Sequence, residues 1–203
     1  MKKFFSYFFP VTKKISTEFN GIVELTYYNG RKMLNSEHAN YSYDSLQRLL
    51  KFGLTKIDVS KVDTILLLGL GGGSVIKTLT NDFDFKGKIT ALELDKTIID
   101  IAENEFQIAP GTQLEIINGD ALEFVKNAGQ EFDLIIIDLF IDNKVPDIFY
   151  SEIFWKPVSI LIKKQGCFIF NASVTNASAA LLTPMLQSTQ NAFNIERFDH
   201  VEA

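Results

Sequence analysis

The sequence has little of what several classes of protein require. Its 203 residues include one cysteine, Cys167, and two histidines, His38 and His200. A single cysteine cannot form a disulfide within the chain, which favours a cytoplasmic protein. One thiol and two imidazoles provide no zinc-type ligand cluster, so we predict no metal site. We interpret Cys167, in the apolar run GCFIF, as a buried structural thiol.

The sequence also lacks a basic excess and a long apolar run. Its 20 Lys and Arg residues and 25 Asp and Glu residues give a formal net charge of −5, which disfavours a nucleic-acid partner. No apolar run approaches the roughly 20 residues that span a membrane. The N-terminus, MKKFFSYFFP, has no small-residue cleavage site, so we reject a signal peptide. We expect this aromatic segment to pack on the domain or on a second subunit, with membrane-surface attachment as the alternative.

An apolar run followed by clustered glycines is the most informative stretch. Residues 64–79 have the sequence TILLLGLGGGSVIKTL, which predicts a buried parallel strand, a tight turn and the start of a helix. Glycines let the backbone turn sharply and approach a ligand, and the first helical turn offers unpaired N–H groups. We interpret the stretch as a nucleotide-binding loop, with a ligand-free glycine-rich turn as the alternative.

The spacing of the glycines limits which class of nucleotide the loop could bind. The pattern is G-x-G-x-G, and Ser74 stands where the dinucleotide motif places its third glycine, so NAD is disfavoured but stays open. No glycine precedes Lys77, which rules out a phosphate loop of the P-loop type. A second predicted strand at 89–95 contains Glu93, which lies 93 − 73 = 20 residues after Gly73. A carboxylate there suits the two hydroxyls of a ribose.

Two further predicted strands also end in polar residues. Residues 114–118 lead into Gly119-Asp120-Ala121, and residues 132–137 lead into Asp138. The carboxyl ends of parallel strands share one edge, where open α/β sheets bind ligands. Apolar stripes at 95–106 and 121–128 predict covering helices. The pattern therefore predicts an α/β fold with a doubly wound, mostly parallel, Rossmann-like sheet.

The flanking segments complete the predicted organisation. Asn29-Gly30 between two β-prone runs predicts a small N-terminal β-hairpin. We place an aromatic segment, this hairpin and a short helix in residues 1–55, and the nucleotide-binding domain in residues 56–203. Further predictions are a helix terminator at Gly53, a helix over 148–162 kinked or broken near Lys156, a strand at 166–171, a helix within 172–191 and a sixth strand at 194–198.

These motifs resemble the spermidine synthase-like group of class I S-adenosylmethionine-dependent transferases. The resemblance covers about residues 21–171 and is carried by ILLLGLGGGSV, ALELD, NGDALEFV, FDLIIIDLF and IFYSEIFWKPVSILIKKQGCFIFN. It implies the class I methyltransferase fold, S-adenosylmethionine or its decarboxylated form as cofactor, and a homodimer.

The resemblance also implies roles for individual residues. The loop glycines would pass under the methionine part of the cofactor, and the ends of the next two strands would meet the ribose and the adenine. Asp138 would lie beside the reacting sulfonium, and Tyr43 would face the substrate. The cofactor-binding positions are Gly69, Gly71, Gly73, Glu93, Leu94, Asp120, Ala121 and Asp138.

The loop after Asp138 lies where a substrate must approach. Apolar residues at 139–141, beginning with Leu139, would exclude water, and Asp138 and Asp142 could steer a cationic group. The alternative is that Asp142 is a solvated loop acid and that Asp147 caps a helix.

The chain departs from spermidine synthases at the groups that hold and deprotonate a diamine. It has Gly72 in place of an aspartate, DLFID at 138–142 in place of D-S-[ST]-D-P, and Tyr43-Asp44-Ser45 in place of Tyr-[HQ]-Glu. We therefore predict first a methyltransferase acting on an unknown small-molecule acceptor, with Asp138 as the catalytic base. The alternatives are an aminopropyltransferase using decarboxylated S-adenosylmethionine, and a catalytically silent cofactor-binding or dimerisation module.

Overall fold

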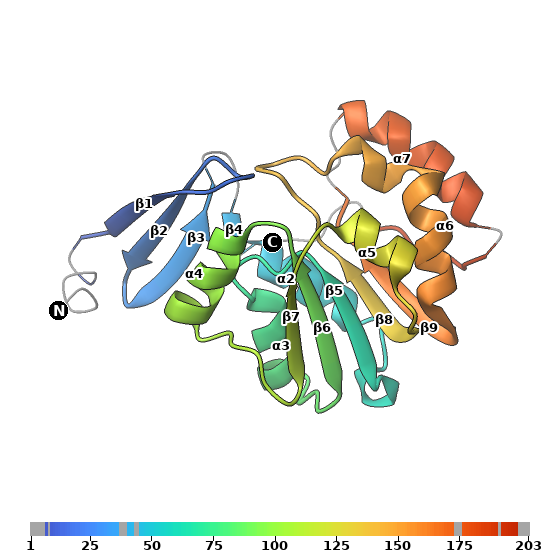
Figure 1. The fold of residues 1–203 in the computed structure, drawn as a ribbon, viewed down its shortest axis with the longest axis horizontal. Helices are drawn as coiled ribbons and strands as arrows, with labels where there is room; N and C mark the ends of the chain where they lie inside the picture. The colour runs from blue at the N-terminus through green and yellow to red at the C-terminus, as the bar shows by residue number, and fades with distance from the viewer. Residues whose placement is uncertain are drawn as a thin grey trace.

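The computed structural model describes residues 7, 9–36, 40–42, 45–172, 176–190 and 192–198. They form two sheets, an antiparallel one near the N-terminus and a parallel one that makes up most of the molecule. Figure 1 shows the antiparallel sheet at one end of the molecule, beside α4, with α6 and α7 at the other end.

The N-terminal sheet is larger than the predicted hairpin. The turn at Asn29-Gly30 is confirmed: Tyr28 pairs with Arg31, and both turn residues have positive φ, 47° and 74°. Two strands escaped prediction because one has little apolar alternation and the other is very short. The strand order is β1-β2-β3-β4, with β1 (Val11–Ser16), β2 (Ile22–Tyr28), β3 (Arg31–Asn35) and β4 (Asn40–Ser42).

The second sheet is the predicted doubly wound α/β sheet. All four of its strand pairings are parallel, and its order is β7-β6-β5-β8-β9. The winding direction reverses between β5 and β8, which is the switch point where such sheets bind ligands. The strands are β5 (Thr64–Leu68), β6 (Lys88–Glu93), β7 (Leu114–Asn118), β8 (Phe132–Ile137) and β9 (Ile162–Phe170).

Helices cover both faces of this sheet and create two apolar cores. Along β5, Ile65 and Leu67 face one core, and Leu66 and Leu68 face the other. The first core contains α2 (Ser45–Leu54), α3 (Ser74–Asp82), α4 (Lys96–Phe106) and buried residues of the N-terminal sheet. The second contains α5 (Ala121–Asn127), α6 (Glu152–Leu161) and α7 (Asn176–Thr189). Two 3-10 turns, η1 (Val59–Lys61) and η2 (Asp147–Tyr150), complete the described elements.

Three local predictions were wrong. Gly53 does not end α2 but lies inside it, where a Cβ would stand 3.2 Å from Ile169 Cγ2, so the residue permits close packing on β9. α6 is not broken near Lys156 but continues through Pro157, which lies between the buried Trp155 and Val158, so of the predicted kink or break only the kink stays a prediction. Residues 194–198 form no strand; Phe198 instead packs edge to face on Phe52, with ring centroids 5.1 Å apart.

None of the helices within the described residues is long and apolar enough to cross a membrane.

Candidate functional site

A pocket of about 470 Å³ opens at the carboxyl ends of the parallel strands. It draws on the loops after β5, β6, β7 and β8, and also on the turn between β1 and β2 and on α2. Nine residues predicted as site residues line it together: Gly69, Gly71, Glu93, Leu94, Asp120, Ala121, Asp138, Leu139 and Asp142. The sheet topology therefore brings distant motifs to one cavity.

One predicted site residue, Gly73, lies away from the pocket wall, and another, Tyr43, is not described. Gly73 does not line the pocket; it is the N-cap of α3, with φ of 76°, and a Cβ there would lie 2.4 Å from Ile108 Cγ1. Backbone conformation and packing are sufficient to explain a glycine at this position, and its cofactor role stays a prediction. Tyr43 lies outside the described residues.

The glycine loop is held close to the end of β8. Gly69 has φ of 96°, and a Cβ there would lie 2.2 Å from the carbonyl oxygen of Asp138. Gly71 also has positive φ, 52°, and its N–H donates to Glu93 Oε2 over 3.1 Å. A side chain at Gly69 would displace the backbone that frames the pocket, and the positive φ of both residues favours glycine.

Glu93 connects the glycine loop to the end of β6. Its Oε2 accepts from Gly71 N, and its Oε1 accepts from Asp95 N over 3.1 Å. Burial raises the pKa of Glu93, against the opposing effect of these two backbone hydrogen bonds. Each carboxylate oxygen can accept a second hydrogen bond, so Glu93 can hold the loop and still receive donors from a ligand.

Asp138 is a second buried carboxyl group of the pocket whose pKa is raised. Burial raises its pKa to about 6, although a hydrogen bond from Asn171 acts in the opposite direction. The Asn171 Nδ2 donates to Asp138 Oδ1 over 2.8 Å, and Asn171 is only 6% exposed. A carboxyl group with this pKa changes its protonation state close to neutral pH, which suits acid–base chemistry.

Asn171 was not predicted as a site residue, although the pairing of β8 with β9 indicates its position. Ile137 pairs with Phe170, so the residues that follow β8 and β9 must lie side by side. A polar residue directly after β9 is thus placed beside Asp138 by parallel register alone.

Asp142 is not the solvated loop acid of the alternative interpretation. It is half-buried, has φ of 53°, and its Oδ1 accepts a short 2.5 Å hydrogen bond from the Ser36 hydroxyl. This contact joins the loop after β8 to the end of β3. The alternative role for Asp147 is also wrong, since Pro146 is the N-cap and Asp147 is the first residue of η2.

Asp120 has a structural role as well as a place in the pocket. Its Oδ1 accepts from Glu123 N over 2.9 Å and so caps α5, while the residue is exposed and lines the cavity with Ala121. The NGDA motif is therefore explained partly by helix capping.

The pocket wall also includes residues that the sequence did not indicate. Phe19 and Asn20 come from the β1–β2 turn, and Leu49 comes from α2. They join the predicted apolar residues of the loop after β8, of which Ile141 is 43% exposed.

The charged side chains that the described residues contribute to the pocket wall are all acidic. Its charged residues are Glu93, Asp120, Asp138 and Asp142, and the part of the chain that the structure describes contributes no Lys, Arg or His to the wall. Such a pocket favours cationic ligands over anionic ones. Within the same described part, no three or more His, Cys, Asp or Glu side chains are grouped so that they could hold a metal ion.

Known proteins similar to this chain include two kinds of transferase. The chain is 29% identical over 119 residues to a polyamine aminopropyltransferase of Vibrio vulnificus, covering 57% of this chain and 40% of that protein. It is 28% identical over 120 residues to an eEF1A lysine and N-terminal methyltransferase of Mus musculus, covering 53% and 17% respectively. A solved structure of human methyltransferase-like protein 13 in complex with SAH matches with a TM-score of 0.58 and 20% identity, covering 71% of this chain and 70% of that one.

These similarities differ in what they establish. The matched region spans less than half of either curated relative, and the solved structure, at 20% identity, shows the fold alone. The family model described as the spermine/spermidine synthase domain matches residues 46–200, which contain the glycine loop, Glu93, Asp138 and Asn171. Because this match covers more than half of the chain, the protein belongs to the spermine/spermidine synthase domain family.

Proposed function

We propose that the protein is an S-adenosylmethionine-dependent transferase that methylates a small-molecule acceptor. The observation that carries the proposal is the convergence of the glycine loop, Glu93 and Asp138 on one pocket at the switch point of the sheet. Family membership and the similarity to a methyltransferase and to an SAH-bound structure support it.

The residues present fit such a cofactor. Gly69 and Gly71 would lie under its methionine part, Glu93 and Leu94 would hold the ribose, and the loop at Asp120 and Ala121 would meet the adenine. When bound, S-adenosylmethionine supplies an activated methyl group, so the protein has mainly to align the acceptor and exclude water.

Asp138 would take the proton from an amine acceptor. At pH 7.5 its carboxyl is largely ionised, because its pKa is about 6, and it can still accept a proton more readily than an ordinary aspartate. The Asn171 amide would hold the carboxylate in place, and the apolar residues at 139–141 would keep water away from the reacting groups.

Aminopropyl transfer from decarboxylated S-adenosylmethionine is the second candidate, favoured by the charge of the pocket. The described wall contains four carboxylates and no basic residue, so it provides no side-chain cation to pair with the methionine carboxylate. The decarboxylated form lacks that carboxylate and carries more positive charge, which fits an acidic wall. The similarity to an aminopropyltransferase points the same way.

Calorimetric titration with each form of the cofactor tests the proposal. Tighter binding of S-adenosylmethionine would support methyl transfer, and preference for the decarboxylated form would support aminopropyl transfer. The same protein is then incubated with a panel of amines, and release of S-adenosylhomocysteine or methylthioadenosine is measured. Binding without turnover would favour a catalytically silent module, and binding of neither cofactor would overturn the proposal.

A further inference from the structure

A second buried carboxylate, Asp95, lies just behind the pocket. It is 0% exposed, and its two oxygens have different partners. Oδ1 accepts from Thr97 N over 3.0 Å and caps α4. Oδ2 accepts from Phe19 N over 3.1 Å and from Asn20 Nδ2 over 3.4 Å. One oxygen therefore serves the local helix, and the other holds a turn about 75 residues earlier in the chain.

The β1–β2 turn is built to present those donors. Its ends are closed by Thr17 N donating to Gly21 O over 2.7 Å, and Asn20 N donates to Thr17 Oγ1 over 3.0 Å. Gly21 supplies the positive φ, 64°, that the turn needs. Phe19 and Asn20 line the pocket, where the Phe19 side chain is 40% exposed.

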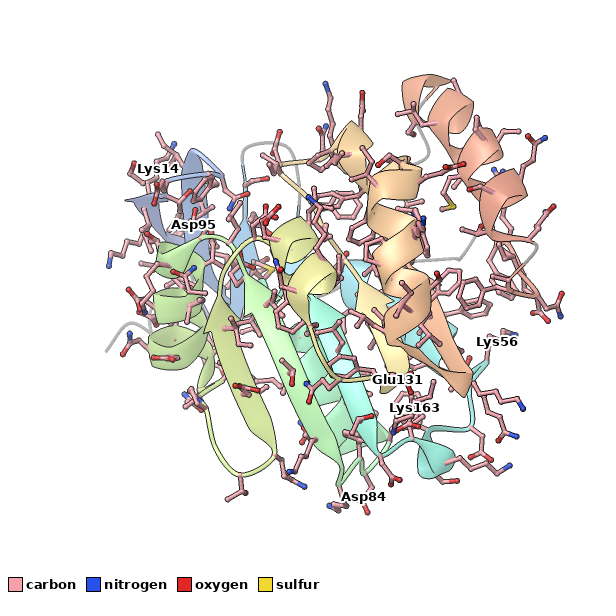
Figure 2. The ribbon with its side chains drawn as sticks, turned by 45° about the vertical axis from the view of Figure 1, so that its right-hand side comes forward. Lys14, Lys56, Asp84, Asp95, Glu131 and Lys163 are labelled. Atoms are coloured by element: carbon pink, nitrogen blue, oxygen red, sulfur yellow. The ribbon has the colours of Figure 1, made fainter. Side chains whose placement is uncertain are left out.

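Asp95 also connects this turn to the glycine loop. The N–H of Asp95 donates to Glu93 Oε1, and Glu93 Oε2 receives the N–H of Gly71. The hydrogen bonds thus run without a break from the glycine loop through two acids to the β1–β2 turn. Figure 2 labels Asp95 at the start of α4, next to the N-terminal sheet.

Helix capping alone does not require a carboxylate here. Ser, Thr or Asn caps a helix about as well as Asp, and each does so without placing a charge in a buried position. The full set of contacts does require it, because both oxygens accept: Thr97 N donates to Oδ1, while Phe19 N and Asn20 Nδ2 donate to Oδ2. An asparagine would keep one acceptor for Thr97 but would direct an N–H₂ group at the Phe19 N–H.

We propose that Asp95 is a positioning residue for the bound nucleoside: its Oδ2 holds the Thr17–Gly21 turn in place, so that the N-terminal sheet forms one wall of the binding site. The Ser36 to Asp142 hydrogen bond fastens the same sheet to the loop after β8, on the acceptor side. The inference rests on the proposed function only for the identity of the ligand.

The test uses Asp95→Asn and Asp95→Ser, both of which can still cap α4. In each variant, exchange of the Phe19 amide, followed by NMR in ligand-free protein, should accelerate about ten- to hundredfold, while the first-turn amides of α4 keep their protection. The Kd for S-adenosylhomocysteine should rise about tenfold or more, measured by calorimetry. Asp100→Asn is the matched control, because Asp100 lies on the exposed side of α4 paired with Lys96. It should change neither quantity.

Retained protection of Phe19 in both variants would overturn the inference, and so would an unchanged Kd despite an opened turn. If only the amides of α4 lost protection, Asp95 would be a helix cap and nothing more. Wild-type protein that binds no nucleoside would instead overturn the proposed function, and exchange at Phe19 would still decide whether Asp95 holds the turn.

Discussion

Two aspartates at opposite ends of β8 show how differently one strand uses the same residue type. Asp133, near the amino end, accepts four hydrogen bonds on Oδ2, from Asp63 N, Thr64 N, Thr64 Oγ1 and Lys163 Nζ, over 2.8 to 3.1 Å. Asp138, directly after the carboxyl end, accepts one described side-chain hydrogen bond, from Asn171. Figure 2 labels Lys163 at the edge of the sheet opposite to Asp95.

The two pKa values move in opposite directions for a physical reason. At Asp133, burial alone would raise the pKa, but the hydrogen bonds from Lys163 and Thr64 lower it to about 2. At Asp138, burial outweighs the single amide and raises the pKa to about 6. The ionised Asp133, at the amino edge of the sheet, therefore stabilises the fold. The ionised Asp138, at the pocket edge, destabilises it.

The signs of the two pH effects follow from proton binding. Folded Asp133 binds its proton more weakly than the unfolded chain, so its stabilisation is complete above pH 4 and is lost as the pH falls towards 2. Folded Asp138 binds its proton more tightly, so stability falls as the pH rises from about 4 to 6 and stays lower above it.

Asp138→Asn should have the largest effect on activity and the opposite effect on stability. Turnover should fall about 10²- to 10⁴-fold, because the proton acceptor is lost, while the Kd for S-adenosylhomocysteine, which carries no sulfonium charge for Asp138 to contact, stays within a few-fold. The free energy of unfolding at pH 8 should rise by about 3 kcal/mol and should be unchanged near pH 3, since the buried charge is gone. Enzyme assay and urea unfolding at both pH values measure this. A variant that keeps wild-type turnover would remove Asp138 from the mechanism.

Glu93→Ala should weaken nucleoside binding by about 1–3 kcal/mol, the cost of losing a charged hydrogen-bonding partner. This loss of affinity has two sources: the proposed ribose contact is removed, and the Gly71 N–H loses its acceptor. Glu93→Gln separates them, because its amide oxygen can keep one acceptor. Calorimetry on both variants measures the effect, and undiminished affinity in Glu93→Ala would show that the ribose lies elsewhere.

The sheet and most of the pocket could be predicted because both depend on local pattern. Apolar runs ending in glycine or acid identified β5 to β8, and parallel register then placed Glu93, Asp120 and Asp138 at one edge. The N-terminal wall could not be predicted in this way. Phe19 and Asp95 are joined by a hydrogen bond although they lie 76 residues apart in the sequence. Neither residue belongs to a sequence pattern that predicts this contact.

Asp133→Asn should lower the free energy of unfolding at pH 7 by about 2 kcal/mol and leave nucleoside affinity unchanged. The difference from wild type should shrink as the pH falls from 4 to 2, where the wild-type carboxyl also loses its charge. Urea unfolding across this range measures it. The variant is also the matched control for Asp138→Asn, being the same substitution on the same strand. A loss of turnover equal to that of Asp138→Asn would contradict the division of roles along β8.

Asn171→Ala should have the smallest effect on activity, and that effect should be confined to the pH dependence of turnover. Its amide lowers the pKa of Asp138, so its removal should raise the midpoint of the acid limb of the pH–rate profile by roughly one pH unit, the equivalent of one hydrogen bond. Turnover at pH 9, where Asp138 is ionised in either protein, should then recover towards the wild-type value. A structural defect would lower turnover equally at every pH, because it would not act through the protonation of Asp138. An unshifted midpoint would therefore show that Asn171 supports the fold at the end of β9 without tuning the carboxyl group beside it.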